Sequence, residues 1–252
     1  MNERVWSKFL TATDKQALGG SGWANRAGFG SRPVILVIDV NNDFTGDRDE
    51  PVVESIKRGK FMSCGEHAYK ALPKIKKLLT TGRGKGLPVI YTTGMDPRPD
   101  RWDVGPWGWK NKGLAQLKSG AHVGDTSGTD IHAEIAPAAQ DIIIKKPMPS
   151  AFYSTPLCAY LTLFAADSIL MVGTTTSGCV RASVVDAFCQ AYRVTLVEEG
   201  CFDRFESSHA MNLFDMNAKY ADVVGLEEVV EYIDQLPEDL FELPRGDVGD
   251  GR

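Results

Sequence analysis

The segment RPVILVIDV, residues 32–40, is the feature that most restricts the fold of this chain. After Pro33, the run from Val34 to Ile38 is continuously apolar and mostly β-branched, and it ends in Asp39. A run without polar alternation predicts a strand buried on both faces, as in a parallel sheet. Parallel strands need long crossover connections that cover the sheet. This one segment therefore predicts an α/β protein.

Strand and helix patterns alternate through the rest of the chain. Further strands are predicted at residues 87–94, 141–147 and 167–176, at 194–200, and at the start of 221–236. Helices are predicted within 66–86, 155–166, 179–193 and 209–221, and in the last part of 221–236. The pattern predicts a single-domain, three-layer α/β/α fold of Rossmann-like type, with a central, mostly parallel six-stranded sheet.

Two of the predicted helices show the periodicity clearly. In helix 66–86, one face carries Leu72, Ile75 and Leu79. In helix 179–193, one face carries Val180, Val184, Ala187, Phe188 and Ala191. We expect both faces to pack against the sheet.

One domain accounts for these elements, and we place it at residues 32–240. Residues 1–31 are mixed and end in GGSGWANRAGFGS, which predicts an extended N-terminal arm rather than a packed element. Residues 241–252 are mostly polar and glycine-rich, which predicts a frayed C-terminal tail.

Composition excludes several classes of partner. The net charge is -5 and the isoelectric point about 5.5, so electrostatics do not favour nucleic acid or an anionic membrane. No stretch approaches the roughly 18 apolar residues of a membrane span, and no secretory signal is evident at the N-terminus. Five cysteines without a CxxC pair argue against a disulfide framework. We therefore expect a cytoplasmic protein with reduced thiols.

Polar residues follow several of the predicted strands. In open α/β sheets, ligand sites form beyond the carboxyl ends of the strands. Asp39 ends the first strand, Lys145 and Lys146 end the third, the turn 174–179 follows the fourth, and Arg204 follows the fifth. Either lysine could belong to such a site, and we expect these strand ends to lie close together.

Cys179 lies in that turn, at the start of a predicted helix. Free N–H groups at a helix N-terminus favour a thiolate and can hold a developing oxyanion. Asp39 can act as general base, and a lysine can stabilise the charges. Taken one at a time, each residue has an ordinary structural role: Cys179 as a buried thiol, Asp39 as a turn former and the lysine as a solvated cation. Together they indicate a nucleophile, a base and a cation for acyl transfer to sulfur and then to water.

Three sequence blocks resemble the isochorismatase-like cysteine hydrolases over residues 32–235. The blocks are VILVIDVNNDF, IIIKKPMPSAFYSTPL and GTTTSGCVRASVVDA. The resemblance implies that Asp39, Lys146 (rather than Lys145) and Cys179 are catalytic. It also implies a cis peptide between Thr174 and Thr175, with an oxyanion hole formed by the N–H groups of Thr175 and Cys179.

The resemblance also bears on metals. Nicotinamidase members carry a metal-binding Asp-x-His-x-x-His after the second strand, whereas this chain reads TTGMDPRPDRW there. We therefore expect no metal and no cofactor. The four histidines, His67, His122, His132 and His209, are scattered without ligand spacing.

Arg204 bears on the substrate. The stretch EEGCFDR is similar to the N-carbamoylsarcosine amidohydrolase branch, which implies that Arg204 binds a substrate carboxylate. A surface salt bridge to Asp203 or Glu206 is the simpler alternative. The expected substrate is N-carbamoylsarcosine or a close ureido acid. Maleamate is the alternative, and biuret is disfavoured because it has no carboxylate.

The remaining expectations concern the surroundings of the site. Phe44, Phe152 and Trp107 are candidate pocket walls, although core packing suits the two phenylalanines equally well. The loop with Trp102, Trp107 and Trp109 suits a lid or a subunit interface. The family resemblance implies a homo-oligomer, namely a tetramer. A non-catalytic binding member of the fold is the alternative of another class.

Overall fold

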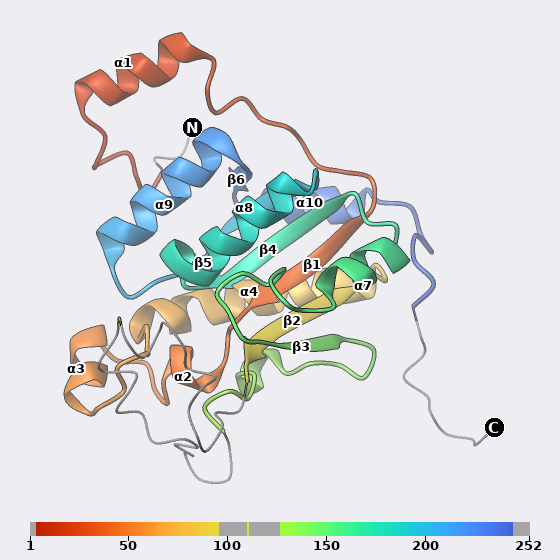
Figure 1. Cartoon of the computed structure of the whole chain (residues 1–252), viewed down its shortest axis with the longest axis horizontal. Coiled ribbons are helices and arrows are strands. Elements are labelled where there is room, and N and C mark those ends of the chain that lie inside the picture. Colours follow the sequence, from red (N-terminus) through yellow and green to blue (C-terminus); the bar gives the residue numbers. More distant parts are fainter. Residues whose placement is uncertain (1–3, 96–109, 111–126, 244–252) are drawn as a thin grey trace.

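A computed structural model describes residues 4–95, 110 and 127–243 of the chain. Its centre is a six-stranded sheet in the order β3-β2-β1-β4-β5-β6, and all five pairings are parallel (Figure 1). The strands are β1 (Pro33–Ile38), β2 (Val89–Gly94), β3 (Ile142–Lys146), β4 (Ser168–Thr174), β5 (Arg193–Phe202) and β6 (Asp222–Val224). The predicted α/β architecture with six strands is confirmed.

Helices cover both faces of the sheet, as Figure 1 shows. One face carries α7 (Leu157–Leu163), α8 (Arg181–Cys189) and α9 (Glu206–Lys219), and the other carries α4 (Glu66–Gly84) and α10 (Leu226–Asp234). Along β1, Leu36 and Ile38 pack into the first layer, whereas Ile35 and Val37 pack into the second. Two buried faces explain why β1 is apolar without alternation.

Two short helices follow β1, and the sequence patterns did not predict them. They are α2 (Asn42–Thr45) and α3 (Val52–Lys57). Asn41 begins α2 with a side-chain cap, because its Oδ1 accepts a hydrogen bond from the Phe44 N–H at 3.2 Å. The helix that this cap begins starts three residues beyond Asp39, at the carboxyl end of the central strand β1.

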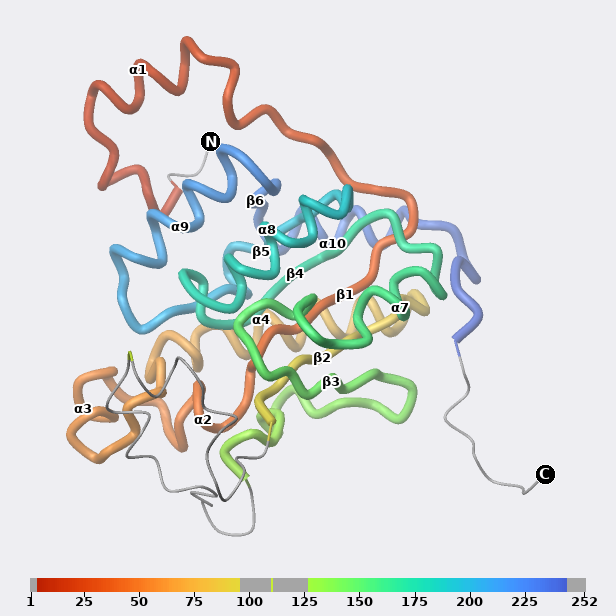
Figure 2. The backbone as a smooth tube through the Cα atoms, viewed as in Figure 1, coloured from red at the N-terminus to blue at the C-terminus, as the bar shows by residue number. Residues whose placement is uncertain are grey.

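The N-terminal arm differs from the extended segment that we expected. It contains the helix α1 (Ala12–Ser21), which begins with a capping box between Thr11 and Asp14. None of its residues is buried, and the helix stands away from the body (Figure 2). Before it, Trp6 is buried against Phe214 of α9, with ring centroids 6.4 Å apart. The arm is therefore helical rather than extended at α1, although α1 is unpacked as expected, and it is packed at Trp6.

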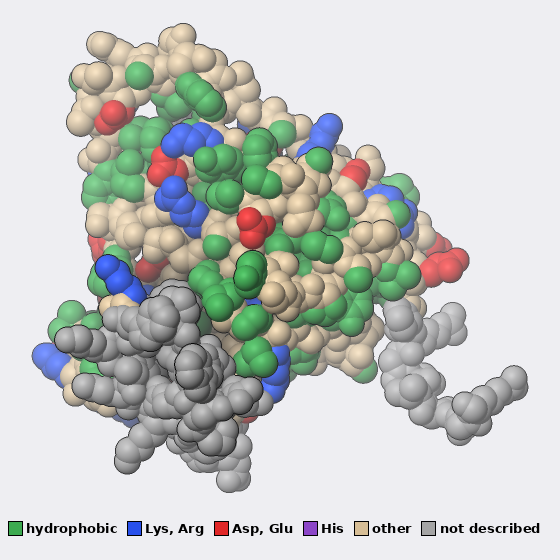
Figure 3. Space-filling model, in the orientation of Figure 1, with side chains coloured by type: hydrophobic (Ala, Val, Ile, Leu, Met, Phe, Trp, Pro, Cys, Tyr) green, Lys and Arg blue, Asp and Glu red, His purple; other side chains and the backbone are tan. Residues whose placement is uncertain are grey.

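The predicted tail begins too early at residue 241. The Arg32 guanidinium lies over the Phe241 ring at 4.6 Å, and Phe241 meets Phe164 edge to face at 6.2 Å. Phe241 thus packs on the body, while residues 244–252 lie outside the described part. On the face in Figure 3, acidic and basic side chains are interspersed. Among the described residues, no helix is long and apolar enough to span a bilayer.

Candidate active site

The strand order creates a crevice beside β1. The chain runs from β1 through β2 to β3 on one side and then returns to β4 on the other side of β1. Connections diverge at such a switch point, and ligands bind beyond the carboxyl ends of the strands there. Asp39 follows β1, and Thr174 ends β4, so both lie at this crevice.

Asp39 is held firmly at the end of β1. Its carboxylate is only 2% exposed, and Oδ1 accepts a hydrogen bond from Thr92 Oγ1 at 3.0 Å. Its backbone has φ +52°, a left-handed conformation that aspartate tolerates better than most residues. The Asp39 N–H donates to the Thr92 carbonyl at 3.0 Å. These contacts fix the direction of the carboxylate.

Lys146 is the lysine that faces Asp39. Its Nζ lies 2.7 Å from Asp39 Oδ2 and donates to the Met148 carbonyl at 3.1 Å. Lys146 is buried, whereas Lys145 is exposed, because side chains alternate along β3. Burial lowers the pKa of Lys146, but the charges of Asp39 and Cys179 outweigh this, so that its pKa is raised.

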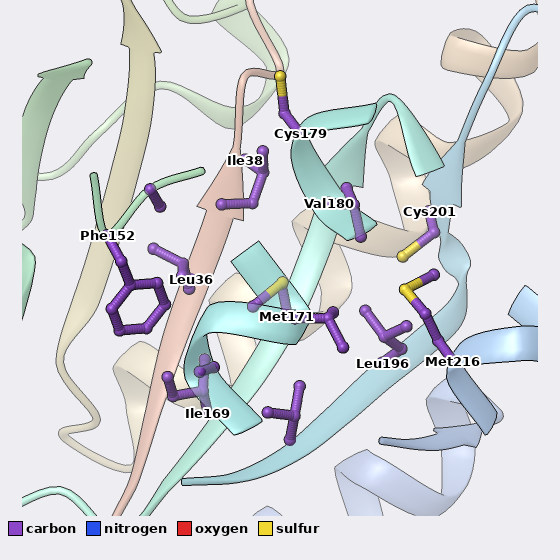
Figure 4. Close-up of a cluster of buried hydrophobic side chains, with 14 of the residues drawn as sticks. Leu36, Ile38, Phe152, Ile169, Met171, Cys179, Val180, Leu196, Cys201 and Met216 are labelled. Atoms are coloured by element: carbon purple, nitrogen blue, oxygen red, sulfur yellow. The ribbon is translucent and has the colours of Figure 1, made fainter. Parts of the chain in front are cut away.

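Cys179 meets this ion pair from the other side of the crevice. It lies in a five-residue π-helical turn, Thr176–Val180, which joins β4 to α8 and which we call the nucleophile turn. The side chain is 8% exposed and within hydrogen-bonding reach of both Asp39 and Lys146. In Figure 4, Cys179 points toward the chain that leaves β1, while Val180 points into the core.

The surroundings of Cys179 act against the thiolate that we expected at a helix N-terminus. Burial and the adjacent Asp39 carboxylate raise its pKa to about 12, and Lys146 opposes this only partly. Desolvation is the largest of these causes, because burial disfavours the charged form of the sulfur. If this sulfur acts as a nucleophile, its proton has to leave during attack, and Asp39 is placed to accept it.

The backbone before Cys179 is unusual at two adjacent positions. The peptide bond between Thr174 and Thr175 is cis, where the family resemblance implies one. Gly173 has φ +120°, and a Cβ there would lie 2.1 Å from the Ile38 carbonyl oxygen. Only glycine suits this close approach of β4 to β1. It brings the nucleophile turn next to Asp39.

Two side chains that we did not assign to the site hold the nucleophile turn. Asp203 Oδ2 accepts hydrogen bonds from the Ser177 N–H at 2.9 Å and from Ser177 Oγ at 2.7 Å. His209 Nδ1 lies 2.8 Å from Thr176 Oγ1. Burial lowers the pKa of His209, despite the opposing charge of Asp203. No spacing in the sequence relates α9 to this turn, so only the fold reveals the contacts.

Arg204 lies beside the crevice, and its guanidinium forms no salt bridge with Asp203 or Glu206. Its Nη2 donates to the Met62 carbonyl at 2.5 Å, and its guanidinium lies over the Phe44 ring at 5.8 Å. Its Nε is buried and has no hydrogen-bond partner among the described residues. Phe202 pairs in register with Thr174, so Arg204 follows β5 close to the cis peptide.

The three candidate pocket-wall residues have three different outcomes in the structure. Phe44 contacts Arg204 and is part of the site region. Phe152 belongs to the core instead, because its ring lies beside Leu36 and away from Cys179 (Figure 4). Trp107 lies outside the described residues, as does the rest of the tryptophan loop. The interpretation of Phe152 as a pocket wall is therefore not supported.

A cavity of about 660 Å³ lies between residues 4–9, α4 and α9. Asp203 and His209 line it, but Asp39, Lys146 and Cys179 do not. It reaches the two residues that hold the nucleophile turn rather than the Cys179 thiol. Among the described residues, no group of three or more His, Cys, Asp or Glu side chains is arranged to hold a metal ion.

Comparison with known proteins defines the class. The family model described as "Isochorismatase domain" matches residues 33–228, most of the chain. The chain therefore belongs to the isochorismatase family. A cysteine hydrolase from Pseudomonas syringae pv. phaseolicola 1448A shares the fold, with a TM-score of 0.70 at 19% identity, over 85% of this chain and 98% of that one.

Curated relatives point to amide chemistry within this family. N-carbamoylsarcosine amidase from Arthrobacter sp. is 30% identical over 86% of this chain and 77% of its own length. Maleamate amidohydrolase from Pseudomonas putida is 29% identical over 85% of this chain and 92% of its own length. The family to which the chain belongs thus includes amidohydrolases that act on small amides.

Proposed function

We propose that the protein is a cysteine-dependent amidohydrolase of small, carboxylate-bearing amides or ureido acids. One observation carries this proposal: Asp39, Lys146 and Cys179 converge from three strand ends at the β1–β4 crevice. A buried base beside a thiol, with a buried cation paired to that base, is the arrangement that nucleophilic acyl transfer requires.

In the acylation step, Cys179 Sγ attacks the carbamoyl or carboxamide carbon while its proton passes to Asp39. Transfer during attack suits a thiol whose pKa is about 12, since no free thiolate is needed beforehand. The N–H groups of Thr175 and Cys179 are the proposed donors to the tetrahedral oxyanion. Asp39 then protonates the leaving nitrogen, and the C–N bond breaks to release ammonia.

In the deacylation step, Asp39 takes a proton from water, and the resulting hydroxide attacks the thioester carbon. The C–S bond breaks, and the Cys179 sulfur recovers the proton. Lys146, 2.7 Å from Asp39, pairs its positive charge with the carboxylate in each half-reaction. A ureido substrate gives a carbamate, which decomposes to carbon dioxide and the free amine.

Arg204 supports a substrate with a carboxylate. A planar guanidinium can grip a carboxylate through two hydrogen bonds, and its Nε has no partner among the described residues. N-carbamoylsarcosine is the leading substrate, and maleamate is the alternative within the same chemistry. Biuret is disfavoured because it offers Arg204 no negative charge.

The assembly and the compartment are also proposals. The exposed helix α1 and the family membership support a homo-oligomer, for which we propose a tetramer. The five cysteines are free thiols, which supports a reducing, cytoplasmic setting.

The first test is ammonia release from N-carbamoylsarcosine and maleamate by wild type and by Arg204→Gln. We expect release from at least one amide, with KM raised about 10- to 100-fold in the variant, as loss of charged hydrogen bonds predicts. Arg193→Gln is the matched control, since Arg193 binds the arm carbonyls of Ala27 and Phe29 instead. No release from either amide would contradict the proposed substrates and call for a wider screen of small amides.

A further inference from the structure

The carboxylate of Asp203 lies between two parts of the site that are separate in sequence. Its Oδ2 accepts both hydrogen bonds from Ser177, two residues before Cys179. Its Oδ1 accepts the Arg204 N–H at 2.8 Å and the Phe205 N–H at 3.5 Å. One side chain therefore ties the nucleophile turn to the backbone of Arg204.

These hydrogen bonds are the main support of a buried charge. Asp203 is 3% exposed and forms no salt bridge among the residues the structure describes. A buried carboxylate without a paired cation must be satisfied by donors, and here backbone N–H groups and one hydroxyl supply them. The arrangement therefore resists small changes in the relative position of the two segments.

The far end of Arg204 is fixed as well. Met62 accepts a hydrogen bond from Nη2, and the Phe44 ring lies under the guanidinium. Because both the backbone and the guanidinium of Arg204 are held, the direction of this side chain depends on where Asp203 fixes the Arg204 backbone.

We propose that Asp203 is a positioning residue that sets the spacing between the Cys179 nucleophile and the Arg204 guanidinium. It thereby selects carboxylate-bearing substrates whose carboxylate and scissile carbon match that spacing. The inference rests on the proposed role of Arg204 as carboxylate ligand. Asp203 touches neither substrate nor reacting atoms and acts through the two segments that it joins.

The chemistry of the position requires a carboxylate. Both oxygens of Asp203 face hydrogen-bond donors, and a carboxylate presents acceptors only. An asparagine has one acceptor oxygen and one NH₂ group, which would face an N–H in either orientation. Asp203→Asn therefore releases either Ser177 or the Arg204 backbone.

The test measures alkylation of Cys179 by iodoacetamide, resolved by peptide mass spectrometry, with and without maleate as a protecting dicarboxylate. Asp39 is the acceptor of the thiol proton as the sulfur attacks the reagent, so the assay needs no resting thiolate. This readout needs no turnover. In wild type, maleate should slow alkylation, and Arg204→Gln should abolish the protection. In Asp203→Asn, the maleate concentration for half-protection should rise at least about tenfold. In the variant that combines Asp203→Asn with Arg204→Gln, maleate protection should be no weaker than in Arg204→Gln alone.

Asp222→Asn is the matched control. Asp222 is also buried and also accepts two backbone N–H groups, from Ala27 at 3.1 Å and Gly28 at 2.8 Å. It holds the arm rather than the site, so half-protection should stay at the wild-type value. Ser177→Ala removes one hydrogen bond without changing charge and should raise the half-protecting concentration about three- to tenfold. Ser177→Ala replaces Asp203→Asn as the test variant if Asp203→Asn does not fold.

Three results would overturn the inference: no protection of wild type, wild-type protection in Asp203→Asn and Ser177→Ala, or an equal shift in Asp222→Asn. Failure of the proposed function is a separate result. If neither amide is hydrolysed but the protection pattern holds, Asp203 positions a carboxylate site whose reaction is different.

Discussion

Lys146 and Lys145 show how a single position decides the chemistry of this site. Both lysines end the same strand, and the residues alone did not distinguish them. Alternation along β3 buries Lys146 against Asp39 and leaves Lys145 at the surface. The resemblance selected the same lysine, but the physical reason is the register of β3 beside β2, which sequence patterns do not specify.

The buried ion pair predicts a large difference between the two lysines. Lys146→Met leaves Asp39 as an uncompensated buried carboxylate, which should cost about 3–5 kcal/mol of unfolding free energy. Lys145→Met, at the exposed neighbouring position, should change it by less than about 1 kcal/mol. Urea denaturation of both variants measures this, and equal losses would contradict the burial that we assign to Lys146.

Cys179 should remain protonated at neutral pH. Its raised pKa means that the neutral thiol contributes stability below pH 9.0, and this contribution is lost as the pH rises toward 12. The absorbance at 240 nm of wild type minus Cys179→Ser should therefore show no thiolate step between pH 6 and pH 9, roughly the range below the ordinary thiol pKa. A step in that range would show that the thiolate forms before attack.

At the scale of elements, long periodic patterns were predictable and locally determined ones were not. The face of α4 with Leu72, Ile75 and Leu79 is buried as predicted. On α8, Val184 and Ala187 are buried but Phe188 is 48% exposed, and its ring meets Tyr220 edge to face at 5.5 Å. The helix α1 depends on a Thr–Asp capping box, a signal that the surrounding glycines outweighed in our interpretation.

The junction of β4 and the nucleophile turn predicts a sharp glycine requirement. Gly173→Ala places a Cβ 2.1 Å from the Ile38 carbonyl at a backbone φ of +120°, and should cost about 3 kcal/mol. Gly19→Ala is the control, since it lies in the exposed helix α1 with nothing within 4 Å. It should raise stability by up to about 1 kcal/mol. Similar thermal denaturation midpoints for the two variants would contradict the packing described.

At the scale of the molecule, the apolar run in β1 and the strand–helix alternation were enough to predict the α/β fold. The order of the strands was not predictable from these patterns, because each βαβ unit can extend the sheet on either side. That order places β1 between β2 and β4 and so brings Asp39 to Cys179. Asp203 and His209 escaped prediction for the same reason, since their partners are distant in sequence.

The central claim is that Cys179 is the nucleophile of an amide hydrolysis. The most direct test is ammonia release from the better amide by Cys179→Ala and by Cys189→Ala, a control at an exposed cysteine. The account predicts loss of activity in the first variant and wild-type activity in the second. It also predicts an acid-quenched acyl adduct on the peptide that contains Cys179. Full ammonia release by Cys179→Ala would contradict it.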